Sequence, residues 1–186
     1  DAEIVPVGKD QLQHLEMTRD VAQRFHNVYG ETFVLPEAQV NEATMYVTGT
    51  DGHKMSKSKN NTINIFADEK VLKKQIMGIL SDSKSLEEPK DPSTDATFAI
   101  YKLMASQEQI EEMSAHYLAG NYGYGHAKKE LLELILETYR EAREDYNYLM
   151  QHTDELEAHL LKGAEKAREK AQEVLSRVRA QVGLRA

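Results

Sequence analysis

Most of this 186-residue chain follows one pattern, in which apolar residues recur at helical spacing. From about residue 68 onward the spacing predicts helices near 68–80, 98–105, 107–118, 124–150 and 153–182. The apolar positions of the last two helices form continuous stripes, and the stripe over 153–182 contains several alanines. We expect both stripes to lie in a core, where the alanines allow close helix packing. The sequence therefore predicts a mostly α-helical fold.

The start of the chain follows a different pattern. Residues 4–7 are an apolar, β-branched run, Gly8-Lys9-Asp10 is a turn, and helical spacing extends from Gln11 to Tyr29. A strand, a glycine turn and a helix can present backbone N–H groups and a helix N-terminus to a nucleotide. Asp10 followed by Gln13 is also typical of an ordinary helix N-cap with a capping-box partner. Both interpretations can hold together.

The most informative short motif is the pentapeptide Lys54-Met55-Ser56-Lys57-Ser58. It lies between Asp51-Gly52-His53 and Asn60-Asn61, residue types that indicate a mobile loop. A loop with two ammonium groups and two hydroxyls can fold over a polyphosphate and place positive charge where negative charge accumulates. The alternative is a solvated Lys/Ser-rich turn without function, which is the usual meaning of an arbitrary basic pentapeptide.

This pentapeptide is the KMSKS signature of class I aminoacyl-tRNA synthetases, and the chain around it resembles the bacterial tryptophanyl-tRNA synthetases. The likeness is strongest over residues 4–20 and extends over nearly the whole chain, through 22–25, 29–33, 36–38, 82–83, 123–125 and 163–167. One departure lies ahead of the signature. The family usually has a Met-Ser-Leu run and a proline there, whereas this chain has Tyr46 to His53 without either.

The resemblance implies a fold and a division of the chain. Residues 1–66 would be the second half of a class I Rossmann-type nucleotide-binding domain with the KMSKS loop, a small α/β part. Residues 67–186 would be a helical, anticodon-binding-like bundle. A HIGH-type sequence, which such enzymes carry in their first βα unit, does not occur in the 186 residues. We therefore expect a carboxyl-terminal portion that lacks the HIGH-containing half and is inactive alone.

The resemblance also implies an enzyme, a tryptophan–tRNA ligase. It would activate L-tryptophan with ATP to the adenylate and transfer it to tRNA(Trp). Gly8, Lys9 and Asp10 would bind ATP, with Asp10 accepting from a ribose hydroxyl. Gln11 would line the amino-acid pocket, and the backbone at Met45 would meet the adenine ring.

The KMSKS loop carries over from the family as further ATP-binding residues. Lys54, Met55, Ser56, Lys57 and Ser58 would contact the nucleotide, and Lys54 and Lys57 would be catalytic. Lys57 would hold charge on the departing pyrophosphate together with Mg²⁺, which arrives with ATP, and no protein-held metal is expected. Neither reaction step needs a protein nucleophile, so orientation and electrostatic stabilisation carry the catalysis.

Two alternative functions are weighed against this one. Tyrosyl-tRNA synthetase is the nearest relative in fold and loop, but the stretch from Val5 to Gln11, with His14 and Glu16, resembles the tryptophan branch. The other alternative is a non-catalytic synthetase-like tRNA-binding paralogue, which an upstream HIGH-type motif would exclude. A metal site at His152, Glu155 and His159 is disfavoured, because their spacing is wrong for the known zinc motif.

Charge and composition bound the class of protein. The net charge of −8 argues against a general nucleic-acid binder, although residues 161–186 carry 7 basic and 3 acidic side chains. Along that last helix Lys162, Lys166, Lys170 and Arg177 lie on one side, as either a solvated face or a phosphate-contacting surface. The chain has no cysteine and no apolar run long enough to span a membrane, and we expect no signal peptide. We expect a cytoplasmic homodimer.

Overall fold

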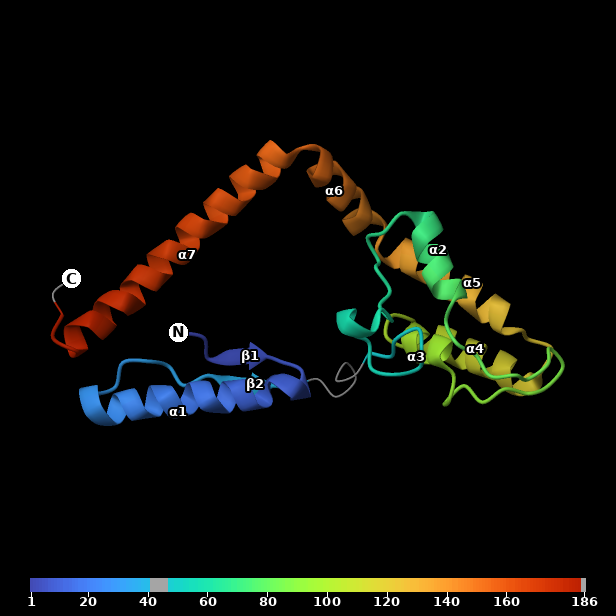
Figure 1. Cartoon of the computed structure of the whole chain (residues 1–186), viewed down its shortest axis with the longest axis horizontal. Helices are drawn as coiled ribbons and strands as arrows, with labels where there is room; N and C mark the ends of the chain where they lie inside the picture. The colour runs from blue at the N-terminus through green and yellow to red at the C-terminus, as the bar shows by residue number, and fades with distance from the viewer. Residues whose placement is uncertain (41–46, 185–186) are drawn as a thin grey trace. The chain divides into compact units, whose positions relative to one another are not determined.

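The computed structural model describes residues 1–40 and 47–184 and is mostly helical (Figure 1), which confirms the predicted fold class. The chain divides into two compact units: Asp1–Met45 with Leu149–Ala186 form the first, and Tyr46–Tyr148 form the second. These compact units do not test the predicted domain boundary at residue 66, which stays a prediction. Among the described helices, none combines the length and apolarity that a membrane crossing needs.

The small α/β part lies in the first unit. The strand β1 (Ile4–Pro6) pairs in parallel with β2 (Glu37–Gln39), with Val5 opposite Ala38. Parallel neighbours need a crossover connection, and the helix α1 (Leu12–Tyr29) supplies it, as Figure 1 shows. The strand, turn and helix predicted for the start of the chain are therefore confirmed.

The first turn of α1 begins one residue later than predicted. A short 3-10 turn, η1 (Lys9–Gln11), precedes the helix, and the N-cap residue is Gln11, whose side chain makes no capping hydrogen bond. Asp10 lies inside η1, one residue ahead of the N-cap. The prediction of Asp10 as the N-cap residue is therefore wrong.

Polar and aromatic contacts fasten the segment between α1 and β2 onto the helix. The Arg19 guanidinium donates to the carbonyl oxygen of Pro36 at 2.7 Å. Near the carboxyl end of α1, the rings of Phe25 and Phe33 lie 5.1 Å apart, and the Phe33 amide donates to His26 Nε2 at 3.0 Å. These contacts bring β2 back beside β1.

The long helix α7 (Thr153–Gln181) belongs to the same unit and has no buried residue. Its Arg177 guanidinium donates to both carboxylate oxygens of Asp1, at 2.6 and 2.7 Å. On its apolar stripe, Leu160 is 63% exposed and Leu175 is 43% exposed. The prediction that this stripe lies in a core is wrong for this chain. Helical spacing indicates which side of a helix is apolar, but not whether another element covers that side.

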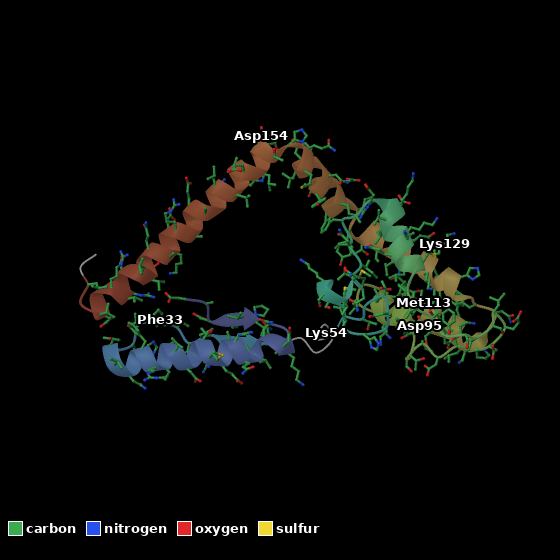
Figure 2. The ribbon with its side chains drawn as sticks, viewed as in Figure 1. Phe33, Lys54, Asp95, Met113, Lys129 and Asp154 are labelled. Atoms are coloured by element: carbon green, nitrogen blue, oxygen red, sulfur yellow. The ribbon has the colours of Figure 1, made fainter. Side chains whose placement is uncertain are left out.

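The second unit holds the main apolar core. Its first helices are α2 (Glu69–Met77), α3 (Ala96–Tyr101), α4 (Gln107–Ala119) and α5 (Tyr124–Thr138). The central helix is α5, which packs against both α2 and α3. Every one of these helices contributes buried side chains, including Leu72, Ile76, Phe98, Tyr101, Met113, Tyr117, Leu131 and Ile135 (Met113 is labelled in Figure 2).

Asp95, also labelled in Figure 2, ties two of these helices together. Its Oδ1 accepts from the Phe98 amide at 2.9 Å, which caps α3, and from the Tyr117 hydroxyl at 2.9 Å. Burial of the ring, followed by the nearby carboxylate, raises the pKa of Tyr117 far above its ordinary value. Tyr117 is therefore a permanent hydrogen-bond donor to Asp95.

The helix predicted over 124–150 is two helices. The first, α5, ends at Thr138, and α6 (Arg140–Gln151) follows without any buried residue, so its part of the predicted core stripe is wrong. The Arg143 guanidinium donates to the carbonyl oxygens of Ile65 and Ala67. These contacts with a segment far away in sequence secure the start of α6. No glycine or proline lies at the break, so the local sequence carries no signal for it.

Residues 81–95, which their polar, proline-containing composition predicts as a linker, are a folded part of the second unit. Lys90 within them is only 2% exposed. Its Nζ donates to the carbonyl oxygens of Ser85, Leu86 and Glu88, at 2.8, 3.3 and 3.0 Å. The segment is wrapped around one buried lysine, so it is not a linker between compact units.

Candidate functional site

The predicted nucleotide turn follows the carboxyl end of β1. The Gln11 amide donates to the carbonyl oxygen of Gly8 at 2.9 Å and closes the turn, while Gln11 Nε2 donates to Asp10 Oδ2 at 3.3 Å. A Cβ at position 8 would lie 2.8 Å from Asp10 Oδ1, so a larger residue would push the carboxylate aside. Lys9, Asp10 and Gln11 are exposed.

This turn has a suitable position for binding a nucleotide. Ligands of open α/β sheets bind beyond the carboxyl ends of parallel strands, and the N-terminus of the following helix carries partial positive charge. The turn lies at such a strand end, directly before α1, and offers one ammonium group, one carboxylate and one amide to solvent. These groups can bind phosphate oxygens and hydroxyl groups. The structure brings Gly8, Lys9, Asp10 and Gln11 together, and their roles stay predictions.

The KMSKS pentapeptide begins in a small hairpin of the second unit. An isolated antiparallel bridge joins Thr48 to Lys54, and the Met55 amide donates to the carbonyl oxygen of Val47 at 2.8 Å. A 3-10 turn, η3 (Lys57–Lys59), comes directly after Ser56. Lys54, which Figure 2 labels, is exposed, as are Lys57 and Ser58, whereas Met55 and Ser56 are partly buried. The Ser56 and Ser58 hydroxyl oxygens lie 3.1 Å apart.

Asn61 is the centre of this segment. It is only 2% exposed, although the sequence interpretation assigns it nothing more than the end of a mobile loop. Its Oδ1 accepts from the Ser56 amide at 2.7 Å. Its Nδ2 donates to Asp51 Oδ1 at 2.7 Å and to the carbonyl oxygen of Lys54 at 3.1 Å. One buried carboxamide thus contacts the backbone of two residues of the pentapeptide.

The neighbours of Asn61 fit closely around it. The Thr50 amide donates to the Asn61 carbonyl oxygen at 2.9 Å, and the Thr50 carbonyl oxygen accepts from the Leu80 amide at 2.8 Å. Gly49 is buried, and a Cβ there would come within 2.6 Å of the Asn61 Cγ. Only glycine leaves room for the carboxamide at this position. The hydrogen bond from Leu80 joins the loop to the residues that follow α2.

Asp51 is the charged partner of Asn61. The hydrogen bond from the Asn61 carboxamide lowers the pKa of the Asp51 carboxyl, and the hydrogen bond from the His53 amide lowers it further. The carboxylate is therefore the favoured form of Asp51 near neutral pH. The charge on Asp51 strengthens the hydrogen bond that holds Asn61, since charge-assisted bonds are stronger than neutral ones.

The KMSKS segment carries groups that suit an anionic ligand. Lys54, Lys57, Ser56 and Ser58 supply ammonium groups and hydroxyls, which bind phosphate oxygens. Within residues 1–40 and 47–184 no group of three or more His, Cys, Asp or Glu side chains could hold a metal ion.

The structure thus gathers the predicted residues into two groups, one in each unit. The first is Gly8 to Gln11, and the second is Lys54 to Ser58. Met45 lies outside the described residues. Sequence reasoning missed Asn61 and Gly49. The signal that could have found Asn61 is its type, because asparagine side chains near turns commonly bond the backbone.

The comparisons with known proteins agree with these motifs. The family described as tRNA synthetases class I (W and Y) matches residues 1–140. The chain is 46% identical over 185 residues to the tryptophan–tRNA ligase of Rhodopirellula baltica and 49% identical over 184 residues to that of Campylobacter jejuni strain RM1221. These alignments cover 100% and 99% of this chain, and 58% of each relative.

A solved structure gives the same result at the level of the fold. The crystal structure of tryptophanyl-tRNA synthetase from Campylobacter jejuni in complex with ADP and tryptophan matches with a TM-score of 0.85 and 49% identity. The match covers 98% of this chain and 57% of that one. The chain therefore spans somewhat more than half the length of the relatives that it matches. By its sequence and its fold, this chain belongs to the family of class I tRNA synthetases for tryptophan and tyrosine.

Proposed function

We propose that this chain is the carboxyl-terminal portion of a tryptophan–tRNA ligase. The single observation that carries the proposal is the KMSKS pentapeptide on a turn that Asn61 holds by hydrogen bonds, with Lys54 and Lys57 exposed. Identities of 46% and 49% to tryptophan–tRNA ligases support the tryptophan branch over the tyrosine branch. The complete ligase would contain this chain and the further residues that its relatives have.

The reaction has two steps. The tryptophan carboxylate attacks the α-phosphate of ATP, which forms tryptophanyl-adenylate and releases pyrophosphate. A hydroxyl of the terminal adenosine of tRNA(Trp) then attacks the activated carbonyl, which forms the ester and releases AMP. Charge accumulates on the departing pyrophosphate in the first step, and preorganised cations are the groups that stabilise such charge. Lys57 stabilises the negative charge on the departing pyrophosphate, and Lys54 adds a second positive charge.

The remaining site residues bind and orient the substrates. Ser56 and Ser58 donate hydrogen bonds to phosphate oxygens, and the turn of Gly8, Lys9 and Asp10 binds ATP, with Asp10 accepting from a ribose hydroxyl. Gln11 lines the amino-acid pocket. The backbone contact to adenine at Met45 stays a prediction, because this residue lies outside the described part of the chain.

Mg²⁺ and the partners complete the proposal. Mg²⁺ keeps several waters and binds substrate phosphates in such sites, so it comes with ATP and not through a protein cage. The exposed lysines of α7 are the basic surface available to tRNA, although Lys170 is engaged by Glu173 at 2.8 Å and Arg177 by Asp1. A homodimer and a cytoplasmic location belong to the same proposal.

Amino-acid-dependent exchange between ATP and pyrophosphate tests the proposal. The complete ligase should exchange pyrophosphate with tryptophan and not with tyrosine, whereas the 186 residues alone should stay at background. Supplying the remaining half in trans should restore exchange. A preference for tyrosine would refute the branch, and exchange by the 186 residues alone would refute the idea that the site is divided.

A further inference from the structure

We infer that Asn61 is a positioning residue for the reaction proposed above, and that Asp51 is the partner that orients it. The buried Asn61 carboxamide holds the backbone of Lys54 and Ser56, so that the two lysines of the pentapeptide project from one fixed turn. The inference rests on the proposed function for its catalytic consequence. We call the three hydrogen bonds of the Asn61 carboxamide, to Ser56, Asp51 and Lys54, the brace. The brace itself rests only on contacts within residues 47–61.

The geometry requires both halves of a carboxamide. The Ser56 amide needs an acceptor, and the Lys54 carbonyl oxygen and the Asp51 carboxylate need donors. A carboxamide supplies an acceptor and donors on one short side chain, whereas a carboxylate supplies acceptors only. Since Asn61 is buried, losing one of these partners would leave a polar group without water to replace it.

The Asp51 carboxylate decides which way the carboxamide points. The two ends of an asparagine carboxamide have nearly the same shape, so its hydrogen-bond partners decide its orientation. A carboxylate accepts a hydrogen bond from Nδ2 and repels Oδ1. With Nδ2 held by Asp51 at 2.7 Å, Oδ1 faces the Ser56 amide at 2.7 Å. Gly49 lies against the same carboxamide, and a side chain at this position would collide with it.

The consequence for catalysis follows from the stems of the lysines. The side chains of Lys54 and Lys57 are long and flexible. The position of their backbone therefore limits the region that each ammonium group can reach. Charges that are in place before the reaction stabilise a transition state without reorganisation. A loosened turn would place the ammonium groups correctly only part of the time, and the rate of adenylate formation would fall.

The decisive variant is Asn61→Asp in the complete ligase, with Asn60→Asp as its matched control. Both add one negative charge to the same loop, but only Asn61→Asp removes the donors and sets a carboxylate against Asp51. Asn60 is exposed at φ 52°, a left-handed conformation that aspartate also tolerates. In pyrophosphate exchange, Asn61→Asp should lower kcat by about 10- to 100-fold with the KM for tryptophan unchanged. Asn60→Asp should stay within about threefold of the parent enzyme.

A double substitution distinguishes positioning from a general loss of structure. Combining Asp51→Asn with Asn61→Asp restores a hydrogen bond between positions 51 and 61 with the roles exchanged, and it keeps an acceptor for the Ser56 amide. Only the donor to the Lys54 carbonyl oxygen stays missing, so the recovery should be partial. The double variant should recover about fivefold or more of the lost kcat, as coupled residues do. Active-site titration of each variant separates a lower rate from a smaller fraction of competent enzyme.

Hydrogen–deuterium exchange reads out the brace without any reaction. Peptides that contain Ser56 should exchange faster in Asn61→Asp than in Asn60→Asp, and slow down again in the double variant. If the two single variants behave alike in rate and exchange, or if the double variant recovers neither, the inference is wrong. If the parent enzyme shows no tryptophan-dependent exchange of pyrophosphate, the proposed function has failed, and the deuterium result still decides on the brace.

Discussion

Lys57 and Lys59 carry the same charge in one short 3-10 turn, and both side chains are exposed. Proximity alone cannot tell a specific phosphate contact from diffuse positive charge. The Ser56 amide just before Lys57 is fixed by Asn61, whereas Lys59 lies outside the pentapeptide, beside the left-handed Asn60. The two lysines therefore form a matched pair for a test at the residue scale.

In the complete ligase, Lys57→Ala should lower the rate of adenylate formation by about 10²–10³, the usual effect of removing one preorganised donor. Tryptophan affinity should hardly change, because the residue predicted for the amino-acid pocket, Gln11, is not part of the loop. Lys59→Ala should change the rate little, as exposed lysines usually do. Asp10→Ala should instead weaken ATP binding, since a ribose contact is made before and during the reaction. Single-turnover kinetics would decide, and equal losses for the two lysines would contradict the specific role of Lys57.

The titration of Asp51 is a second property at this scale. Its hydrogen bonds from Asn61 and His53 lower its pKa below the ordinary value of 3.8. Its contribution to stability is therefore fully present above that value and is lost as the pH falls through the lowered pKa. In Asn61→Ala the pKa of Asp51 should rise toward 3.8. Carboxyl chemical shifts in an NMR titration would show this, with Asp91 as the internal control.

Asp91 is suited to this purpose because Ser93 alone supplies the hydrogen bonds that lower its pKa. Its titration should be the same in the parent chain and in Asn61→Ala. An Asp51 pKa that does not move, or that moves together with that of Asp91, would contradict the assignment of the brace.

Among the elements, the segment over 81–95 shows how a polar stretch can be folded without secondary structure. Three carbonyl oxygens surround the Lys90 ammonium group, and the ring of Tyr124 lies 5.3 Å from it. The Lys90 amide also donates to the carbonyl oxygen of Tyr117 at 2.7 Å, which joins the segment to α4. The loop therefore depends on one buried charge.

Lys90→Met should lower the free energy of unfolding of the chain by about 2–3 kcal/mol, because buried carbonyl oxygens would lose a charged donor. The methionine keeps most of the apolar stem, so the loss reports on the ammonium group. Lys84→Met is the matched control: Lys84 is exposed and donates to the carbonyl oxygen of Pro89 at 3.1 Å, so its loss should stay under about 1 kcal/mol. Urea denaturation of both variants would measure the difference. Similar losses would mean that the buried lysine has no special part.

For the whole molecule, the distribution of exposed apolar side chains is the main property. On α1, Met17 is 58% exposed, Val21 is 70% exposed and Val28 is 66% exposed. An apolar groove of about 420 Å³ lies beside this helix, lined in part by Val21, Phe33 and Val174. A surface of this kind usually contacts another chain or another part of the protein.

We expect the chain to form a homodimer or a larger oligomer at micromolar concentration. Burial of the α1 surface would drive the association, so Val21→Glu should shift the equilibrium toward the monomer. Sedimentation equilibrium over a range of concentrations measures both. A monomer throughout that range would contradict the prediction, and an unchanged distribution for Val21→Glu would assign the contact to another surface.

The sequence by itself determined several of the helices and the chemistry of the motifs. Periodicity placed α1, α4 and α7 to within one or two residues, because side-chain spacing along a helix depends on local geometry alone. The pentapeptide and the stretch from residue 4 to residue 20 indicated the family, because those residue types at those positions are specific. A short-range signal was sufficient in each case.

The tertiary structure alone decided what depends on neighbours distant in sequence. The break at Tyr139 accompanies the contacts of Arg143 with Ile65 and Ala67, and the stripe of α7 is exposed because no described part of this chain buries it. Lys90 became a core residue through carbonyl oxygens that composition cannot place. Asn61 is buried because Gly49 and Asp51, which belong to the hairpin, lie against its side chain. Burial and hydrogen bonding between separate segments are properties of the fold, and local sequence patterns do not contain them.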